Sequence, residues 1–255
     1  MHPVFDISVN TDLCKHCGSC AKYCSTGHLR FKDGNVTLSS YASCIGCGHC
    51  IAVCPSAAIQ LNGQGPVVAP SDTLERILME RRSIRKFLPT PPPKEDIIRA
   101  LDIAEYAPSG KNRHATRWTV IYGKDKCEAI RSLAFEHCKE TGEAPELLKL
   151  FDKGLDLLTC NAPVVILGHS PDNALNPVID TVIALHIVQL QLERKGYGCC
   201  WGGYMRQITD HCEKLQNALG IPEGSHMRCC MMTGIPDREH YSNIPPRPRA
   251  PVNWL

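Results

Sequence analysis

The sequence predicts two parts of unequal size, a short cysteine-rich domain followed by a larger domain of mixed helices and strands. Two observations lead to this prediction. Eight of the sixteen cysteines lie between positions 14 and 54, and the segment that follows them is rich in glycine and proline. Beyond that segment, helical and strand patterns alternate. We therefore expect a small domain over 1–62, a linker over 63–71 and a large domain over 72–255.

Composition narrows the classes of function. The 255 residues carry a net charge of only +2, which does not suggest a nucleic-acid partner. The longest apolar stretch, 177–192, is interrupted by Asp180, His186 and two glutamines, so we expect no membrane span. No basic and then apolar leader opens the sequence. These features favour the cytoplasm.

Regular elements are expected throughout. In the small domain, 29–38 is typical of a hairpin and 58–61 of a strand. Ser71 is a candidate N-cap for the first helix of the large domain. The tail from Ile244 is rich in Pro and Arg and should be extended. Helical spacing predicts helices over 94–107, 124–139, 145–159, 177–195 and 207–219, and apolar runs predict strands over 118–122, 163–168 and 227–234.

The strongest signal is a repeated cysteine pattern. Three thiols at C-x2-C-x2-C spacing can bind three corners of an iron–sulfur cubane, and a fourth cysteine follows after three intervening residues. In two-cluster ferredoxins this fourth cysteine binds the other cluster. On that logic Cys14, Cys17, Cys20 and Cys54 hold one [4Fe–4S] cluster, and Cys44, Cys47, Cys50 and Cys24 hold the second.

Zinc sites or disulfides are the alternative interpretation of these cysteines. Zinc usually takes paired C-x2-C units, so a third thiol at the same short spacing argues against it. The other eight cysteines are scattered along the chain, and so many free thiols fit a reducing compartment. Because such clusters are sensitive to oxygen, we expect the source to be an anaerobe.

Two basic segments and one loop in the large domain are candidate binding elements. Arg81, Arg82, Ser83 and Arg85 offer guanidinium and hydroxyl donors that suit a phosphate dianion, although a solvated basic helix end is an equally good interpretation. The loop 107–114 is rich in turn-forming residues, which alone indicate an ordinary loop. The tail adds Arg247 and Arg249, which could equally be a disordered basic end.

Taken together, four motifs over 72–255 resemble the nitroreductase family of FMN enzymes. They are Arg-Arg-Ser-x-Arg-x-Phe, Ala-Pro-Ser-x-x-Asn, Gly-x-Gly-x-x-Trp-Gly-Gly and a C-terminal Pro-Arg-Pro-Arg. Residues 5–62 resemble bacterial two-cluster ferredoxins, with Ser25 in place of the usual proline after the fourth cysteine. The whole chain is thus similar to the ferredoxin-fused nitroreductase-like proteins of anaerobes.

The resemblance implies an α+β fold, with a central sheet flanked by helices, and an intertwined homodimer that holds FMN at its interface. The helix over 178–195 would lie in the dimer core. By motif, FMN would contact Arg81, Arg82, Ser83, Arg85, Cys200, Gly202, Gly203, Arg247 and Arg249, together with Pro108, Ser109, Gly110 and Asn112 of the partner subunit.

Two departures from the family pattern border the expected substrate pocket. The stretch after Asn112 reads His114-Ala115-Thr116-Arg117-Trp118 where many members have Gln-Pro-Trp, and Gly202 stands where some have an acidic residue. No side chain is a clear general acid, and His114 and Lys111 are weak candidates. Cys199 and Cys200 could be redox-active or simply buried small residues.

The fusion predicts a route for electrons. An external donor, such as reduced ferredoxin, flavodoxin or a nicotinamide, would supply electrons through the two clusters to FMN and on to an organic acceptor such as a nitroaromatic or a quinone. One alternative is a relay module that turns over no small molecule. Another is a specialised flavin reaction, such as reductive dehalogenation or flavin reduction.

Overall fold

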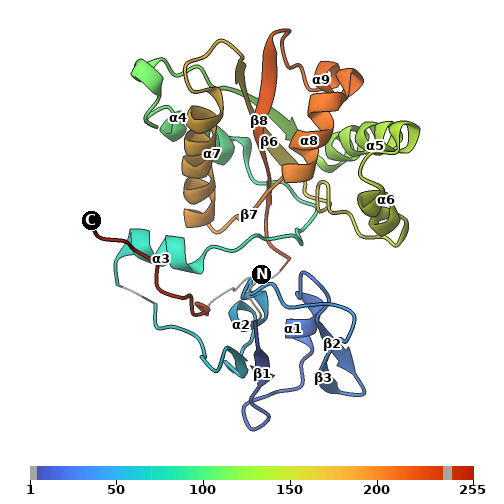
Figure 1. Ribbon diagram of the computed structural model, residues 1–255, viewed down its shortest axis with the longest axis vertical. Coiled ribbons are helices and arrows are strands. Elements are labelled where there is room, and N and C mark those ends of the chain that lie inside the picture. The colour runs from blue at the N-terminus through green and yellow to red at the C-terminus, as the bar shows by residue number, and fades with distance from the viewer. Residues whose placement is uncertain (1–4, 70, 238–242) are drawn as a thin grey trace. The chain divides into compact units, whose positions relative to one another are not determined.

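The computed structural model describes residues 5–69, 71–237 and 243–255. The chain divides into two compact units, and the first of them is discontinuous in sequence (Figure 1). Unit 1 comprises Met1–Arg82 with Arg238–Leu255, and unit 2 comprises Ser83–Asp237. This division differs from the boundaries that we expected, because it groups 72–82 and the C-terminal segment with the cysteine-rich part.

Unit 1 contains two short helices that repeat one conformation. Helix α1 (Ser19–Lys22) begins after Gly18, and helix α2 (His49–Ala52) begins after Gly48. The two glycines have φ values of 70° and 78°, a left-handed conformation that glycine adopts at little cost. Strand β1 (Ile7–Val9) pairs antiparallel with β4 (Ile59–Leu61), and β2 (Leu29–Lys32) pairs with β3 (Asn35–Leu38) as the expected hairpin.

Helix α3 (Thr73–Glu80) also belongs to unit 1, and its N-cap is Asp72 instead of the expected Ser71. The Asp72 carboxylate accepts a hydrogen bond from the backbone N–H of Glu75 at 2.9 Å. A carboxylate suits this position because it also carries a negative charge at the positive end of the helix dipole.

Unit 2 is built on a four-stranded antiparallel sheet. Its order is β5 (Arg117–Tyr122), β6 (Val164–Pro171), β8 (Ser225–Gly234) and β7 (Gly198–Trp201). Side chains of the central strand β6 alternate between the two faces, and residues Val164 to Leu167 are fully buried. A strand that is apolar on both faces requires cover on both sides.

Helices supply that cover on each face, as Figure 1 shows. Helices α4 (Lys94–Ala104) and α7 (Pro177–Arg194) pack on one face, in a core with Val164 and Ile166. The other face carries a second core with Val165 and Leu167. That core is covered by α5 (Lys124–Thr141), α6 (Pro145–Asp152), α8 (Gly203–His211) and α9 (Glu213–Ala218). The predicted α+β fold with a flanked central sheet is confirmed.

Two helices differ most from expectation. The helix expected over 145–159 ends at Asp152, because the chain turns at Gly154, whose φ is 79°. The helix expected over 207–219 is two helices, since Cys212 adopts an extended conformation between α8 and α9. Within the described ranges, no helix combines the length and the apolar character that crossing a bilayer would require.

Candidate functional site

The cysteines of unit 1 gather in the crossed combination that the repeat predicted. Cys24, from the first run, lines one hollow together with Cys44, Cys47 and Cys50 from the second. The hollow has about 330 Å³ of empty space, part of it open to solvent. Four thiols around a volume of this kind form a donor set that fits an iron–sulfur cluster. Among residues 5–69, 71–237 and 243–255, no three His, Cys, Asp or Glu side chains are placed to bind a single metal ion.

The other four cysteines include a neighbouring pair drawn from both runs. Burial is the main cause that raises the pKa of Cys20 to about 11, and the neighbouring thiols of Cys54 and Cys17 contribute to this rise. Cys54 therefore lies near Cys20 although it belongs to the second run. Thiols bind iron as thiolates, so cluster assembly must remove these protons. The ligand sets themselves stay a prediction, which this geometry supports.

Backbone and hydroxyl groups surround the cysteine sulfurs in a repeated way. The N–H groups of His16 and Gly46 donate to the sulfurs of Cys14 and Cys44, at 3.5 and 3.3 Å. Hydroxyls stand two residues after each fourth cysteine: Thr26 Oγ1 is 3.8 Å from the Cys24 sulfur, and Ser56 Oγ is 3.7 Å from the Cys54 sulfur. Such hydrogen bonds to sulfur tune cluster potentials.

In unit 2, the segment after Arg82 runs beside the edge strand β7. Ser83 forms a parallel bridge with Cys199, and the N–H of Ile84 donates to the Cys199 carbonyl at 2.9 Å. This pairing brings Ser83 and Arg85 to the strand that leads into Gly202 and Gly203. The structure thus joins two of the predicted cofactor-binding groups. Arg81 and Arg82 belong to unit 1, at its boundary with unit 2.

The residues at the end of β7 leave room for a ligand. Gly202 is the N-cap of α8, so the first amides of this nine-residue helix are available to an anion. A Cβ on Gly203 would meet no atom within 4 Å, whereas one on Gly202 would lie 2.9 Å from the sulfur of Cys230. Packing against Cys230 therefore explains why Gly202 carries no acidic side chain here. Hydroxyl, guanidinium and helix-terminal amides fit the phosphate and ribityl groups of FMN.

The loop that contains Pro108, Ser109 and Gly110 lies elsewhere in unit 2. The N–H of Gly110 donates to the buried carboxylate of Asp180 at 2.9 Å, in the first turn of α7. Strand β7 follows α7 and runs back beside it, where the Trp201 indole N–H donates to Gln189 at 2.8 Å. That a partner subunit supplies the loop stays a prediction.

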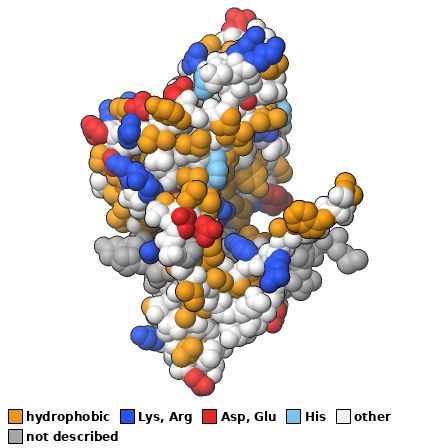
Figure 2. All heavy atoms as spheres, turned by 90° about the vertical axis from the view of Figure 1, so that its left-hand side faces the viewer, with side chains coloured by type: hydrophobic (Ala, Val, Ile, Leu, Met, Phe, Trp, Pro, Cys, Tyr) orange, Lys and Arg blue, Asp and Glu red, His pale blue; other side chains and the backbone are white. Residues whose placement is uncertain are grey.

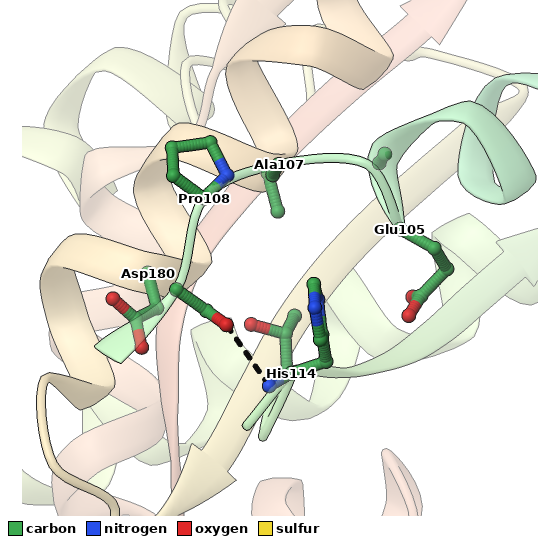
Figure 3. Close-up of a pocket in the computed structure, with 9 residues that line it drawn as sticks. Glu105, Ala107, Pro108, His114 and Asp180 are labelled. Atoms are coloured by element: carbon green, nitrogen blue, oxygen red, sulfur yellow. Dashed lines mark hydrogen bonds between the residues drawn. The ribbon is translucent and has the colours of Figure 1, made fainter. Parts of the chain in front are cut away.

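A hollow of about 240 Å³ opens beside this loop (Figure 3). Glu105, His114 and Asp180 line it together with Pro108 and Ser109. The backbone N–H of His114 donates to Ser109 Oγ at 3.1 Å. Glu105 was not predicted as a site residue, and Asp180 was recognised only as a charge that interrupts an apolar stretch.

The loop holds a strained backbone. Lys111, Asn112 and His114 have positive φ values of 51°, 55° and 45°. Non-glycine residues adopt this region at a cost and often do so at functional sites. A hydrogen bond of 2.9 Å between the His114 ring and the Asn112 side chain holds the two together. The catalytic roles considered for His114 and Lys111 stay a prediction.

The thiols beside β7 are buried. Cys199 and Cys200 are 0% and 4% exposed. Cys160 contacts Cys200, and that hydrogen bond together with burial raises the pKa of Cys160 far above its ordinary value. The Cys160 thiol is therefore held in its protonated form at neutral pH.

Arg247 and Arg249 were both expected near the FMN phosphate. The structure places the Arg247 guanidinium on unit 1, where it donates to the carbonyls of Gly46 and Cys47 at 2.5 and 3.1 Å. In the described part of the chain, Arg249 makes no hydrogen bond or ion pair. The role of both arginines in binding FMN stays a prediction.

Two family models match the chain. Residues 78–235 match the nitroreductase family, and residues 13–58 match a 4Fe-4S dicluster domain. The chain belongs to the nitroreductase family. This membership confirms the predicted family and the oxidoreductase class. The two matches also support the predicted cofactors, FMN and two [4Fe–4S] clusters.

Similar proteins cover the two parts of this nitroreductase-family chain separately. The arsenate respiratory reductase iron–sulfur subunit ArrB of Shewanella sp. (strain ANA-3) is 38% identical over 56 residues, which are 21% of this chain. The match spans only 24% of ArrB. The iodotyrosine deiodinase of Thermotoga neapolitana is 27% identical over 183 residues, covering 68% of this chain and 90% of that protein.

Solved structures resemble the fold of this family member. An FMN-bound nitroreductase from Desulfitobacterium hafniense DCB-2 superposes with a TM-score of 0.61 and 21% identity, covering 73% of this chain and all of that one. An iodotyrosine deiodinase bound to FMN and 3-iodo-L-tyrosine gives a TM-score of 0.54 and 24% identity, covering 72% and 99%.

Proposed function

We propose that this protein passes electrons from an external donor through two [4Fe–4S] clusters to FMN, and from FMN to an organic acceptor such as a nitroaromatic or a quinone. The observation that carries the proposal is the pairing of a cluster-type cysteine arrangement with a nitroreductase unit in one chain. FMN supplies the exchange between one-electron and two-electron chemistry. Reduced ferredoxin, flavodoxin or a nicotinamide could serve as the donor.

The residues of unit 2 would bind and orient. Ser83, Arg85 and the first amides of α8 would hold the phosphate and ribityl groups, since these donors converge at the end of β7. The loop over 108–112 would contact the flavin ring, with Asp180 fixing the loop through Gly110. Arg81 and Arg82 would add positive charge by virtue of their place in the motif.

A second copy of the chain would complete the site. By the family motif, the loop with Ser109 would come from the partner subunit and reach the FMN that is held near Ser83. Apolar side chains gather on the α4–α7 side of unit 2 (Figure 2). Ile98, Val178 and Ile179 are 54%, 52% and 60% exposed there. Exposed apolar surface of this kind marks an interface.

The test is anaerobic purification followed by analysis of iron, sulfide and flavin. We expect about eight irons and one FMN per chain, because eight thiols can hold two cubanes. The dithionite-reduced protein should then be reoxidised rapidly by a nitroaromatic or a quinone, with reduced product formed. A preparation that contains zinc in place of iron and no flavin would overturn the proposal. Reoxidation by a protein acceptor alone would instead indicate the relay function.

Reductive dehalogenation is a second candidate, favoured by the similarity to the Thermotoga neapolitana deiodinase over most of unit 2. In such a reaction a carbon–halogen bond takes two electrons and one proton, and the halide leaves. The reduced protein can be mixed with a halogenated phenol under the same conditions. Release of halide in step with reoxidation would support this candidate, and reoxidation without halide would exclude it.

A further inference from the structure

The C-terminal segment of unit 1 lies on the second cysteine run. The side-chain amide of Asn243 donates to the carbonyls of Ile51 and Cys54, at 3.2 and 2.7 Å. The N–H of Val67 donates to the Ile244 carbonyl at 2.6 Å. Residues about 190 positions apart in sequence therefore form one local structure around the second run.

In the second cysteine run, the C-terminal segment takes the place that the β2–β3 hairpin has in the first run. In the first run, a Cβ placed on Gly18 would lie 3.1 Å from the Phe31 ring of the β2–β3 hairpin. In the second run, a Cβ on the equivalent Gly48 would lie 2.4 Å from Pro245. The hairpin covers the start of α1, and the C-terminal segment covers the start of α2 in the same position.

The C-terminal segment also places a permanent positive charge beside the second cysteine run. The two terminal nitrogens of Arg247 donate to the carbonyls of Gly46 and Cys47, within the loop that carries two of the four proposed ligands. At the equivalent place in the first run, the His16 ring interacts with the Gly34 carbonyl at 3.0 Å. A guanidinium cannot lose its proton in a protein, so its charge persists at every working pH.

We infer that Arg247 raises the reduction potential of the cluster held by Cys44, Cys47, Cys50 and Cys24, and so makes it the better electron acceptor of the two. Reduction adds one negative charge to a cluster that is already anionic. A cation fixed on the ligand loop stabilises that reduced state more than the oxidised state. Its hydrogen bonds also polarise the peptide groups on either side of Cys47, which strengthens their N–H dipoles.

This inference rests on the proposed function, because it requires that the clusters are present. It differs from the expected role of Arg247 at the FMN phosphate, and the two roles predict different losses. If Arg247 tunes the cluster, its substitution changes a cluster potential and leaves flavin binding intact. If Arg247 binds the FMN phosphate, its substitution changes the affinity for flavin and leaves the clusters intact.

The experiment compares R247Q, R247K and R249Q with the wild-type holoprotein. Iron and flavin contents are measured first, and then the two cluster midpoints are determined by anaerobic redox titration followed by electron paramagnetic resonance. Iron and flavin missing from the wild type would refute the proposed function itself, which keeps that failure distinct from failure of this inference. R249Q removes a neighbouring charge that does not contact the loop, and serves as the matched control.

In R247Q we expect the midpoint potential of one cluster to fall by about 59 mV. For a one-electron couple at a fixed potential, this fall lowers the ratio of reduced to oxidised cluster about tenfold. The other midpoint and the dissociation constant of FMN should stay unchanged. R247K should retain most of the potential, since it keeps the charge, and R249Q should shift neither midpoint. Because Arg247 is exposed, the difference between wild type and R247Q should shrink at high salt.

Two results would overturn the inference. One is unchanged midpoints with weakened FMN binding in R247Q, which would return Arg247 to the phosphate. The other is a midpoint that rises, because uncovering a cluster to solvent stabilises its reduced form and would show that the segment acts only as a cover. If R247Q does not retain iron, R247K decides. A midpoint drop of about 59 mV in R247K, which keeps the positive charge, would exclude that charge as the cause.

Discussion

At the scale of single residues, the fourth cysteine of each run defines how unit 1 is held together. Cys24 lines the hollow of the second run, and Cys54 influences Cys20 of the first. We therefore predict that Cys24→Ala removes the cluster whose other ligands are Cys44, Cys47 and Cys50. Iron should fall from about eight to about four per chain. Mössbauer spectroscopy, with Cys54→Ala as the mirror variant, should show that each substitution removes a different cluster.

Buried Asp156 is the residue on which we expect unit 2 to depend most. Its carboxylate accepts hydrogen bonds from the N–H groups of Leu158, Thr159 and Asn161 at 2.9 to 3.0 Å, and pairs with Arg131 at 3.1 Å. Burial would raise the pKa of Asp156, but these hydrogen bonds outweigh it and lower the pKa below its usual value. The network fixes the left-handed conformation of Asn161 and its neighbour before β6.

We predict that Asp156→Asn destabilises unit 2 by about 3 kcal/mol at pH 7, because one acceptor oxygen is lost and Arg131 keeps a buried charge. Since the folded-state pKa is depressed, the stabilisation by Asp156 is fully present above the unfolded-state value of 3.8. It is lost as the pH falls through the lower folded-state pKa. Urea unfolding followed by tryptophan fluorescence should show a large difference at pH 7 that narrows toward pH 3. A constant difference would contradict this account.

At the scale of elements, helix α7 packs very closely against strand β6 in unit 2, at Gly168. A Cβ on Gly168 would lie 2.4 Å from Thr181 Cγ2 and 3.1 Å from the Trp118 ring. We predict that Gly168→Ala destabilises the protein by about 2 kcal/mol through overpacking. Gly65→Ala is the control, because nothing lies within 4 Å of that position and its φ is not positive. Equal melting temperatures for the two variants would contradict the prediction.

Sequence patterns located most elements of unit 2 but not all of their ends. Periodicity identified α7 to within one residue, and an apolar run identified β6 but ended it at 168, three residues before Pro171. Periodicity did not identify β7, since four residues that read Gly-Cys-Cys-Trp have no alternation. That strand is fixed by pairing with β8 and by Trp201, whose indole N–H donates to Gln189 at 2.8 Å. Neither contact is local in sequence.

In the candidate site, too, the features that depend on nearby residues were predicted, whereas contacts between residues far apart in the sequence were not. Spacing alone predicted the cysteines, because each tripod of thiols is local. The resemblance to the nitroreductase family predicted Ser83 and Gly203 as binding residues, but not the bridge that brings Ser83 to the strand before Gly203. The position of Arg247 lay beyond its reach, since that guanidinium contacts Gly46 about 200 residues away.

At the scale of the whole molecule, the exposed apolar residues of α4 and α7 form the surface that we propose for contact with a second copy of the chain. Ile179 is 60% exposed in the first turns of α7, near Asp180 and the loop that it holds. We predict that Ile179→Asp converts the dimer to a monomer and lowers FMN content at least tenfold, while iron stays near eight per chain. Light scattering coupled to size exclusion, with flavin and iron analysis, checks this.

Arg206→Ala is the matched control for that variant, because its partner Asp210 lies one turn along the same helix, at 2.7 Å, and the pair is partly exposed. Such a surface ion pair contributes about 0–1 kcal/mol. A monomer that still holds FMN would show that one chain suffices, and would contradict the proposed shared site.

The discontinuity of unit 1 has a consequence for biosynthesis. Because Asn243, Pro245 and Arg247 complete the surroundings of the second cysteine run, these surroundings are synthesised only after the nitroreductase part. The nitroreductase part, encoded in between, can fold while the run beside Cys47 is still uncovered. Iron–sulfur assembly factors would thus have a window for delivering the second cluster, and synthesis of the segment around Arg247 would close it.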